Sequence, residues 1–96
     1  MTWITTIPPA CADAPLRELY HRIYALYPRE YLTEVPVLVR ADGGTDSIIA
    51  AHSLLPNVME PIFTALARLL APELPLSRRQ HEMITTLVSS INQCHY

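Results

Sequence analysis

The sequence contains no lysine, only two glycines and no long apolar segment, and each of these shortages narrows the possible functions. Its seven basic residues are all arginines and form no basic stripe, so binding to a nucleic acid has no electrostatic support. Apolar stretches are broken by Pro, Glu or Arg well before twenty residues, which argues against a membrane-spanning helix. Gly43 and Gly44 predict a turn. A phosphate-binding loop would have a lysine directly after its last glycine, and none follows here.

The start of the chain has none of the features of an export signal. Residues 1–9 carry no positively charged side chain, and their apolar run is too short for a signal peptide. We therefore expect a cytoplasmic protein. In that reducing compartment, two cysteines are usually free thiols or a redox site rather than a structural disulfide. Cys11 follows two prolines in a loop and matches no motif, so we interpret it as incidental.

Composition predicts one small domain that associates with other copies of itself. A chain of 96 residues is near the lower end of what buries a useful core alone, so we expect residues 1–96 to form a single domain. Half of the residues are hydrophobic, which is more than so small a domain can bury. We therefore expect a homo-oligomer.

Apolar periodicity predicts an all-α fold, a small bundle of about four helices. The first helix is expected to begin near Ala14–Pro15 and to end by Pro28, with a core stripe of Leu16, Leu19, Tyr20, Ile23, Leu26 and Tyr27. The second is expected over 46–54, with Asp46 as its N-cap. The third is expected from about Pro56 to Ala71, with a buried face of Met59, Ile62, Phe63, Leu66, Leu69 and Leu70.

The fourth helix has the best-defined start. Ser77 and Gln80 are spaced as a capping box, and an apolar face follows, made by Met83, Ile84, Leu87, Val88 and Ile91. Outside the helices, residues 1–12 are expected to form an extended, proline-rich arm. Residues 28–46 have no clear period; 35–39 could be a short strand, but Pro36 favours an irregular loop.

The segment from Ser77 to Tyr96 resembles a known enzyme family. Glu82 precedes Cys94 by twelve positions, within Leu76-Ser77-Arg78-Arg79-Gln80-His81-Glu82-Met83-Ile84 and Asn92-Gln93-Cys94-His95-Tyr96. This pattern is similar to that of the alkyl hydroperoxidase D and carboxymuconolactone decarboxylase-like proteins, in their peroxidase-related branch. The second cysteine and the histidine of the family motif would fall beyond Tyr96.

The resemblance implies a thiol peroxidase that reduces hydroperoxides through a cysteine pair and is re-reduced by a thiol or protein donor. In the family, the cysteine nearer the C-terminus attacks the peroxide, so Cys94 would be the resolving partner and Glu82 part of a proton relay. His95, between the two cysteine positions, could stabilise a thiolate or be a variable filler. We expect the chain as printed to be inactive alone, because disulfide closure needs two neighbouring thiols.

Geometry sets a condition on this interpretation. Along one straight helix, twelve residues rise about 18 Å, so Glu82 and Cys94 cannot touch directly. The chain must break near Asn92–Gln93, or the glutamate must act through water and the missing histidine. Without the family spacing, Glu82 would be an ordinary solvated charge in a first helical turn, and Cys94 an ordinary thiol near a C-terminus.

Other functions remain possible at this stage. A carboxymuconolactone decarboxylase would lack the cysteine pair, and Cys94 argues against it. A non-catalytic helical oligomerisation module would agree with the apolar excess. No cofactor is indicated, and a metal site is not indicated either, because the histidines do not occur at metal-binding spacings: His21, His52, His81 and His95.

Overall fold

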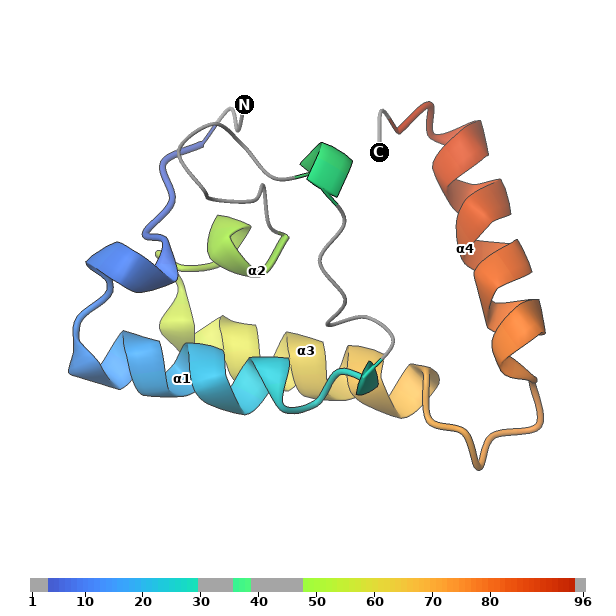
Figure 1. Cartoon of the computed structure of the whole chain (residues 1–96), viewed down its shortest axis with the longest axis horizontal. Helices are drawn as coiled ribbons and strands as arrows, with labels where there is room; N and C mark the ends of the chain where they lie inside the picture. The colour runs from blue at the N-terminus through green and yellow to red at the C-terminus, as the bar shows by residue number, and fades with distance from the viewer. Residues whose placement is uncertain (1–3, 30–35, 39–47, 95–96) are drawn as a thin grey trace. The chain divides into compact units, whose positions relative to one another are not determined.

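The described part of the chain is built from four α-helices. The structure is a computed structural model, and it describes residues 4–29, 36–38 and 48–94. The helices are α1 (Ala14–Tyr24), α2 (Ile48–Ala51), α3 (Pro56–Leu69) and α4 (Arg78–Ile91), with two short 3₁₀ turns, η1 (Pro9–Cys11) and η3 (Pro36–Leu38) (Figure 1). These ranges contain no strand, so the prediction of an all-α fold with about four helices is confirmed.

The chain divides into two compact units. We call Met1–Ala65 the N-terminal unit and Leu66–Tyr96 the C-terminal unit. All of the buried residues that the structure describes lie in the N-terminal unit, and none lies in 66–94. Among the described helices, each is too short or too polar to cross a lipid bilayer.

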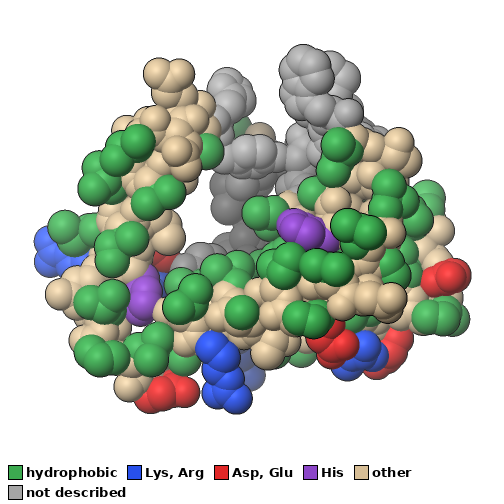
Figure 2. Space-filling model, turned by 180° about the vertical axis from the view of Figure 1, so that it is seen from behind, with side chains coloured by type: hydrophobic (Ala, Val, Ile, Leu, Met, Phe, Trp, Pro, Cys, Tyr) green, Lys and Arg blue, Asp and Glu red, His purple; other side chains and the backbone are tan. Residues whose placement is uncertain are grey.

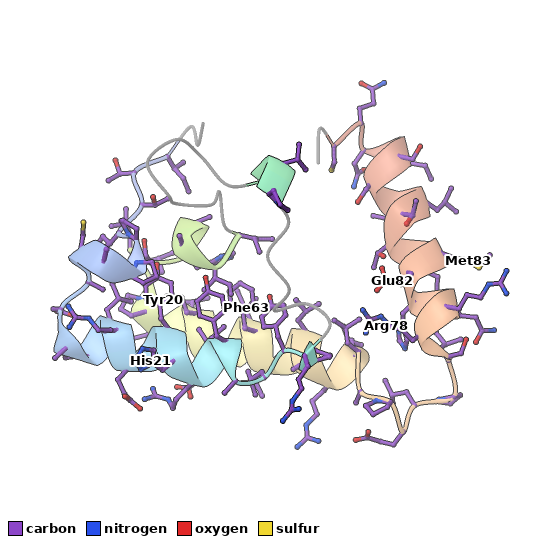
Figure 3. The ribbon with its side chains drawn as sticks, in the orientation of Figure 1. Tyr20, His21, Phe63, Arg78, Glu82 and Met83 are labelled. Carbon is purple, nitrogen blue, oxygen red and sulfur yellow. The ribbon has the colours of Figure 1, made fainter. Side chains whose placement is uncertain are left out.

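The core of the N-terminal unit forms where α1, α2 and the start of α3 meet. Figure 1 shows α1 and α3 side by side and running in the same direction, and Figure 3 shows Tyr20 and Phe63 among the side chains that gather there. Tyr20, Ile23 and Met59 have at most 1% of their surface exposed. The complete buried cluster is Ala12, Leu16, Leu19, Tyr20, Ile23, Ile49, Ala50, Met59 and Phe63.

Local signals explain the start of α1. Asp13 is its N-cap, and one carboxylate oxygen accepts a hydrogen bond from the Leu16 backbone N–H at 2.9 Å. Pro15 lies in the first turn, where its missing N–H costs nothing. On the outer surface, Arg22 binds the Glu60 carboxylate of α3 through two hydrogen bonds, of 2.9 and 3.1 Å. This bidentate pair holds the pKa of Glu60 below its usual value.

The N-terminal arm is held to the core by two buried hydroxyl groups, those of Ser53 and Tyr20. Ser53 has 2% of its surface exposed, and its oxygen accepts a hydrogen bond from the Ile7 N–H at 2.7 Å. The Tyr20 hydroxyl donates to the Ile7 carbonyl at 2.6 Å. Both backbone groups of Ile7 are thereby satisfied by side chains of the core.

The predicted extended arm is only partly observed. The backbone is extended at Pro8, but Pro9–Cys11 turn into η1, where the Cys11 N–H donates to the Pro8 carbonyl at 2.9 Å. The fixed φ of proline suits a 3₁₀ turn as well as an extended chain. Of the predicted loop at 28–46, the structure describes 28–29 and η3, which replaces the alternative of a strand at 36–38.

Some predicted helix details were wrong. Helix α1 ends at Tyr24, and the next turn has tighter i to i−3 hydrogen bonds, from Leu26 N–H to Ile23 and from Tyr27 N–H to Tyr24. This change of pitch moves Leu26 off the core stripe, and 39% of its surface is exposed. Helix α2 is shorter than the predicted 46–54, because similar tight bonds from His52 and Ser53 follow Ala51. The expected N-cap, Asp46, lies outside the described residues.

The predicted buried face of α3 holds only at its N-terminal end. Met59 and Phe63 are buried, whereas Ile62, Leu66 and Leu69 are 42%, 36% and 64% exposed. Pro61 lies inside the helix, within its second turn. The periodicity was correct, but it could not show how far along the helix the core extends.

Candidate functional site

Helix α4 carries the candidate site, and its N-terminus is built as predicted. The Ser77 hydroxyl oxygen accepts a hydrogen bond from the Gln80 N–H at 3.3 Å, and the Gln80 side chain accepts one from the Ser77 N–H at 2.8 Å. This reciprocal capping box satisfies two backbone donors that the helix leaves free. The start of α4 is therefore fixed by local contacts.

Glu82 is paired within the helix. Its carboxylate accepts a hydrogen bond from the Arg78 Nε at 2.6 Å, across one helical turn. Figure 3 shows Glu82 and Met83 pointing to opposite sides of α4. Both partners of the ion pair are partly exposed, with 39% and 47% of their side-chain surface accessible, so solvent screens the pair. Sequence reasoning missed Arg78, although its spacing of four from Glu82 on a helix was a usable signal.

The helix ends at Asn92 and Gln93, which is where the first of the two alternatives for Glu82 and Cys94 placed a change in chain direction. Asn92 is the C-cap, and Gln93 has a positive φ of 52°, in the left-handed region. The Cys94 N–H donates to the Ser89 carbonyl at 2.9 Å, five residues back. This is the closing hydrogen bond of a helix C-terminus that reverses the chain direction.

The reversal places Cys94 beside the last turns of α4. Its thiol is free and exposed, and it borders a shallow hollow with four small hydroxyl side chains, Thr85, Thr86, Ser89 and Ser90. A second shallow hollow, which includes Glu82 and Met83, lies along the helix and does not include Cys94. From Glu82 to Ile91 the helix alone rises about 14 Å. The structure therefore does not bring Glu82 and Cys94 together within one chain.

The third predicted site residue, His95, lies outside the described residues. The contacts of His52 and His81 are local and do not point to a functional site. His52 places its Nδ1 2.8 Å from the Ile48 carbonyl and meets Phe63 edge-on, with ring centres 5.4 Å apart. His81 has a buried Nε2 without a hydrogen-bond partner. In 4–29, 36–38 and 48–94, no cluster of His, Cys, Asp and Glu could hold a metal ion.

Comparison with protein-family models, with curated proteins and with solved structures finds no match to this chain. The similarity of Ser77–Tyr96 to the peroxidase-related branch therefore stays a prediction from the sequence. The arguments that follow rest on the geometry of α4 and of Cys94.

Proposed function

We propose that Cys94 is the resolving thiol of a hydroperoxide-reducing cysteine pair, of the alkyl hydroperoxidase D-like type. The observation that carries the proposal is the chain reversal at Gln93, which presents an exposed thiol directly after a well-capped helix. An exposed thiol on a turn can be reached by a second cysteine. A thiol buried between packed helices could not be reached in this way.

The chemistry has three balanced steps. The thiolate of the attacking cysteine takes the terminal oxygen of the hydroperoxide, becomes a sulfenic acid and releases an alcohol after protonation of the alkoxide. The Cys94 thiolate then attacks the sulfenic sulfur, and water leaves as the disulfide forms. Two thiol molecules or one protein dithiol then reduce the disulfide to two thiols and are themselves oxidised to a disulfide.

The residues around the site favour a limited role for Glu82 in this scheme. Its carboxylate is bound to Arg78 and lies near the other end of α4, so within one chain it does not take the proton of Cys94. Hydroxyl side chains border the thiol instead: those of Thr86, Ser89 and Ser90 are of a type that can donate a hydrogen bond to a thiolate, whereas the Thr85 hydroxyl donates to the Glu82 carbonyl at 3.1 Å. We propose a cytoplasmic location, where free thiols persist and thiol reductants are available.

The test supplies the attacking thiol directly. One cysteine is appended after Tyr96 in a chain carrying Cys11→Ser, and the loss of free thiols and of hydrogen peroxide is followed with dithiothreitol as reductant. Matched controls append serine instead, or add Cys94→Ser to the appended cysteine. We expect an intramolecular disulfide and peroxide consumption only where both thiols are present.

A second candidate function is a non-catalytic helical assembly module that forms homo-oligomers. One observation favours it specifically: no residue of 66–94 is buried, although this stretch carries a regular amphipathic helix. The large apolar side chains of that helix have about half or more of their surface exposed, and the exposed fraction runs from 48% at Ile84 to 70% at Ile91. A helix of this kind is stabilised mainly by tertiary or intermolecular packing rather than by propensity.

A further inference from the structure

We propose that a groove between α1 and the start of α3 binds a small amine, with a primary ammonium group at one end, an apolar body and a hydroxyl group at the other end. This α1–α3 groove lies wholly within the N-terminal unit, so the inference is independent of the function proposed for Cys94. Its volume is about 720 Å³, within the range of about 300–1,000 Å³ that is usual for small-molecule sites. Its two sides include Leu16, Leu19 and Arg22 of α1 and Asn57, Glu60 and Pro61 of α3.

The lining of the α1–α3 groove is mostly apolar. Leu16 and Leu19 belong to the core and are 8% and 6% exposed. Leu54 also borders the groove and is 54% exposed, so its side chain has apolar surface left to cover. Prolines of both helices complete the apolar part. Burying the apolar body of a ligand against these side chains removes their surface from water and is therefore favourable.

The prolines also remove hydrogen-bond donors from the lining. Proline has no backbone N–H, and Pro15 and Pro56 lie in the first turns of their helices, where other residues present a free N–H. Pro61 lies inside α3, four residues after Asn57, so the usual helical donor to the Asn57 carbonyl is missing. Because Asn57 and Pro61 both line the groove, this carbonyl is an acceptor for a ligand.

The side-chain donors of charged and hydroxyl residues at the groove are already occupied. Arg22 gives two hydrogen bonds to the Glu60 carboxylate. The Ser53 hydroxyl forms hydrogen bonds with the Ile7 N–H and with Tyr20. Figure 2 shows basic and acidic side chains next to one another on the protein surface, bordered by hydrophobic side chains in green. A ligand that needs these donors would have to break existing bonds.

Acceptors and negative charge remain for the ligand. One carboxylate oxygen of Asp13 caps α1, and the other accepts no hydrogen bond from the described residues. The Asp13 charge also offsets the positive end of the α1 dipole. The Asn57 side chain offers a donor and an acceptor alike, so it favours neither kind of ligand. Two carboxylates, of Asp13 and Glu60, and one guanidinium, of Arg22, give the lining a net charge of −1. A cation that supplies donors therefore complements the groove, and an anion does not.

The positions of the acceptors set the length of the ligand. Helices α1 and α3 run side by side in the same direction (Figure 1), and the bond between Arg22 and Glu60 marks a common level. Asp13 lies nine residues before Arg22, or about 13 Å along α1. Asn57 lies three residues before Glu60, or about 4–5 Å along α3. The two acceptors are therefore about 9 Å apart along the groove. An ammonium at Asp13 is also separated from Arg22 by more than the screening length of roughly 8 Å in physiological salt.

Tyramine is the probe, because its ammonium and its phenol hydroxyl lie at opposite ends of an apolar body of similar length. In a ¹⁵N–¹H NMR titration at neutral pH, we expect saturable shifts at the amides of Leu16, Leu19 and Asn57, with a dissociation constant of about 0.1–1 mM. Phenethylamine lacks the hydroxyl and should bind about threefold more weakly. The carboxylate analogue, 3-(4-hydroxyphenyl)propionate, should not saturate the chain up to about 10 mM. N-acetyl-lysine methylamide presents the ammonium of a protein side chain and should bind at least about threefold more weakly than tyramine.

Three substitutions locate the site. Asp13→Asn keeps the N-cap, because asparagine caps as well as aspartate, and should weaken tyramine binding about threefold. Glu73→Gln makes the same change at an exposed residue outside the groove and should leave the constant within about 1.5-fold. Pro61→Ala restores an N–H for the Asn57 carbonyl and places a good helix former in α3. It should abolish the advantage of tyramine over phenethylamine without lowering the melting temperature.

Every result of these titrations bears on the inference. Tyramine shifts confined to the groove, weakened by Asp13→Asn and not by Glu73→Gln, support it. An absence of saturation by tyramine up to about 10 mM, or equal binding of the carboxylate analogue, overturns it. Tighter binding of the lysine derivative than of tyramine overturns the small amine as the ligand. A tyramine advantage that survives Pro61→Ala overturns the assignment of the Asn57 carbonyl as acceptor.

Discussion

Replacing Ser53 with alanine removes one of the two hydroxyl groups that connect Ile7 of the N-terminal arm to the core. The Ser53 oxygen is the acceptor for the Ile7 N–H at 2.7 Å, and the residue is 2% exposed. Without it, the Ile7 N–H loses its partner in a partly buried position. Leaving such a group unsatisfied costs about 1–3 kcal/mol.

This loss should be visible as a lower melting temperature of the N-terminal unit. For a domain of 60–100 residues, each 1 kcal/mol corresponds to about 4–8 °C, so we expect Ser53→Ala to lower Tm by roughly 5–20 °C. The near-ultraviolet circular dichroism of the tyrosines reports on this unit, because Tyr20 is in its core and Tyr24 and Tyr27 pack against it. Ser90→Ala, at an exposed position of α4, is the matched control and should change the stability by less than about 0.5 kcal/mol.

A double-variant cycle checks the mechanism. The Tyr20 hydroxyl donates to the carbonyl of the same Ile7 residue, at 2.6 Å. If both hydrogen bonds hold the same segment of the arm, the double variant Tyr20→Phe, Ser53→Ala should lose less free energy of unfolding than the two single variants together. The difference, which is the coupling energy, should be about 0.5–3 kcal/mol. A melting temperature unchanged by Ser53→Ala would refute the claim that this hydroxyl holds the arm in place.

Two further predictions concern helix α4 and the core tyrosines. Ser77→Ala removes one half of the capping box and should destabilise α4 by about 0.5–2 kcal/mol, seen as reduced far-UV helicity, whereas Thr86→Ala should not reduce it. Burial raises the pKa of both Tyr20 and Tyr27 above the ordinary value of 10.0, and in Tyr20 the hydrogen bond with Ser53 partly opposes this. A raised pKa in the folded state means that stability is fully present below pH 10 and falls as the pH rises beyond it. Tyrosinate absorbance should therefore develop at higher pH in the folded chain than in urea, and a folded chain that titrates like the unfolded one would show this reasoning to be wrong.

The local parts of the structure were predictable from the sequence. The capping box of Ser77 and Gln80 needs only residues three apart, and it was confirmed in full. The start of α1 at Ala14 and the start of α3 at Pro56 likewise depend on signals within one turn. The end of α4 at Asn92 agrees with one of the two alternatives that the rise of an α-helix left open for Glu82 and Cys94.

The contacts between distant segments could not be predicted in the same way. Ser53 gives no signal in the sequence, because its partner, Ile7, is 46 residues away. Periodicity identified the apolar sides of α3 and α4 but not what covers them, and Leu69 is as open to solvent as Met83. In the candidate site, the family resemblance made Glu82 part of a proton relay, and the ion pair that it forms with Arg78, one turn before it, was not predicted.

The measurement that tests the proposed chemistry most directly is the redox state of Cys94 after exposure to hydrogen peroxide. In the chain with one cysteine appended after Tyr96 and Cys11→Ser, we predict rapid loss of both free thiols, mapped by mass spectrometry to a disulfide that includes Cys94, together with peroxide turnover under dithiothreitol. The unextended chain should show neither. If the unextended chain consumed peroxide at the same rate and lost that activity on Cys94→Ser, or if the two thiols of the extended chain never formed a disulfide, the assignment of Cys94 as a resolving thiol would be contradicted.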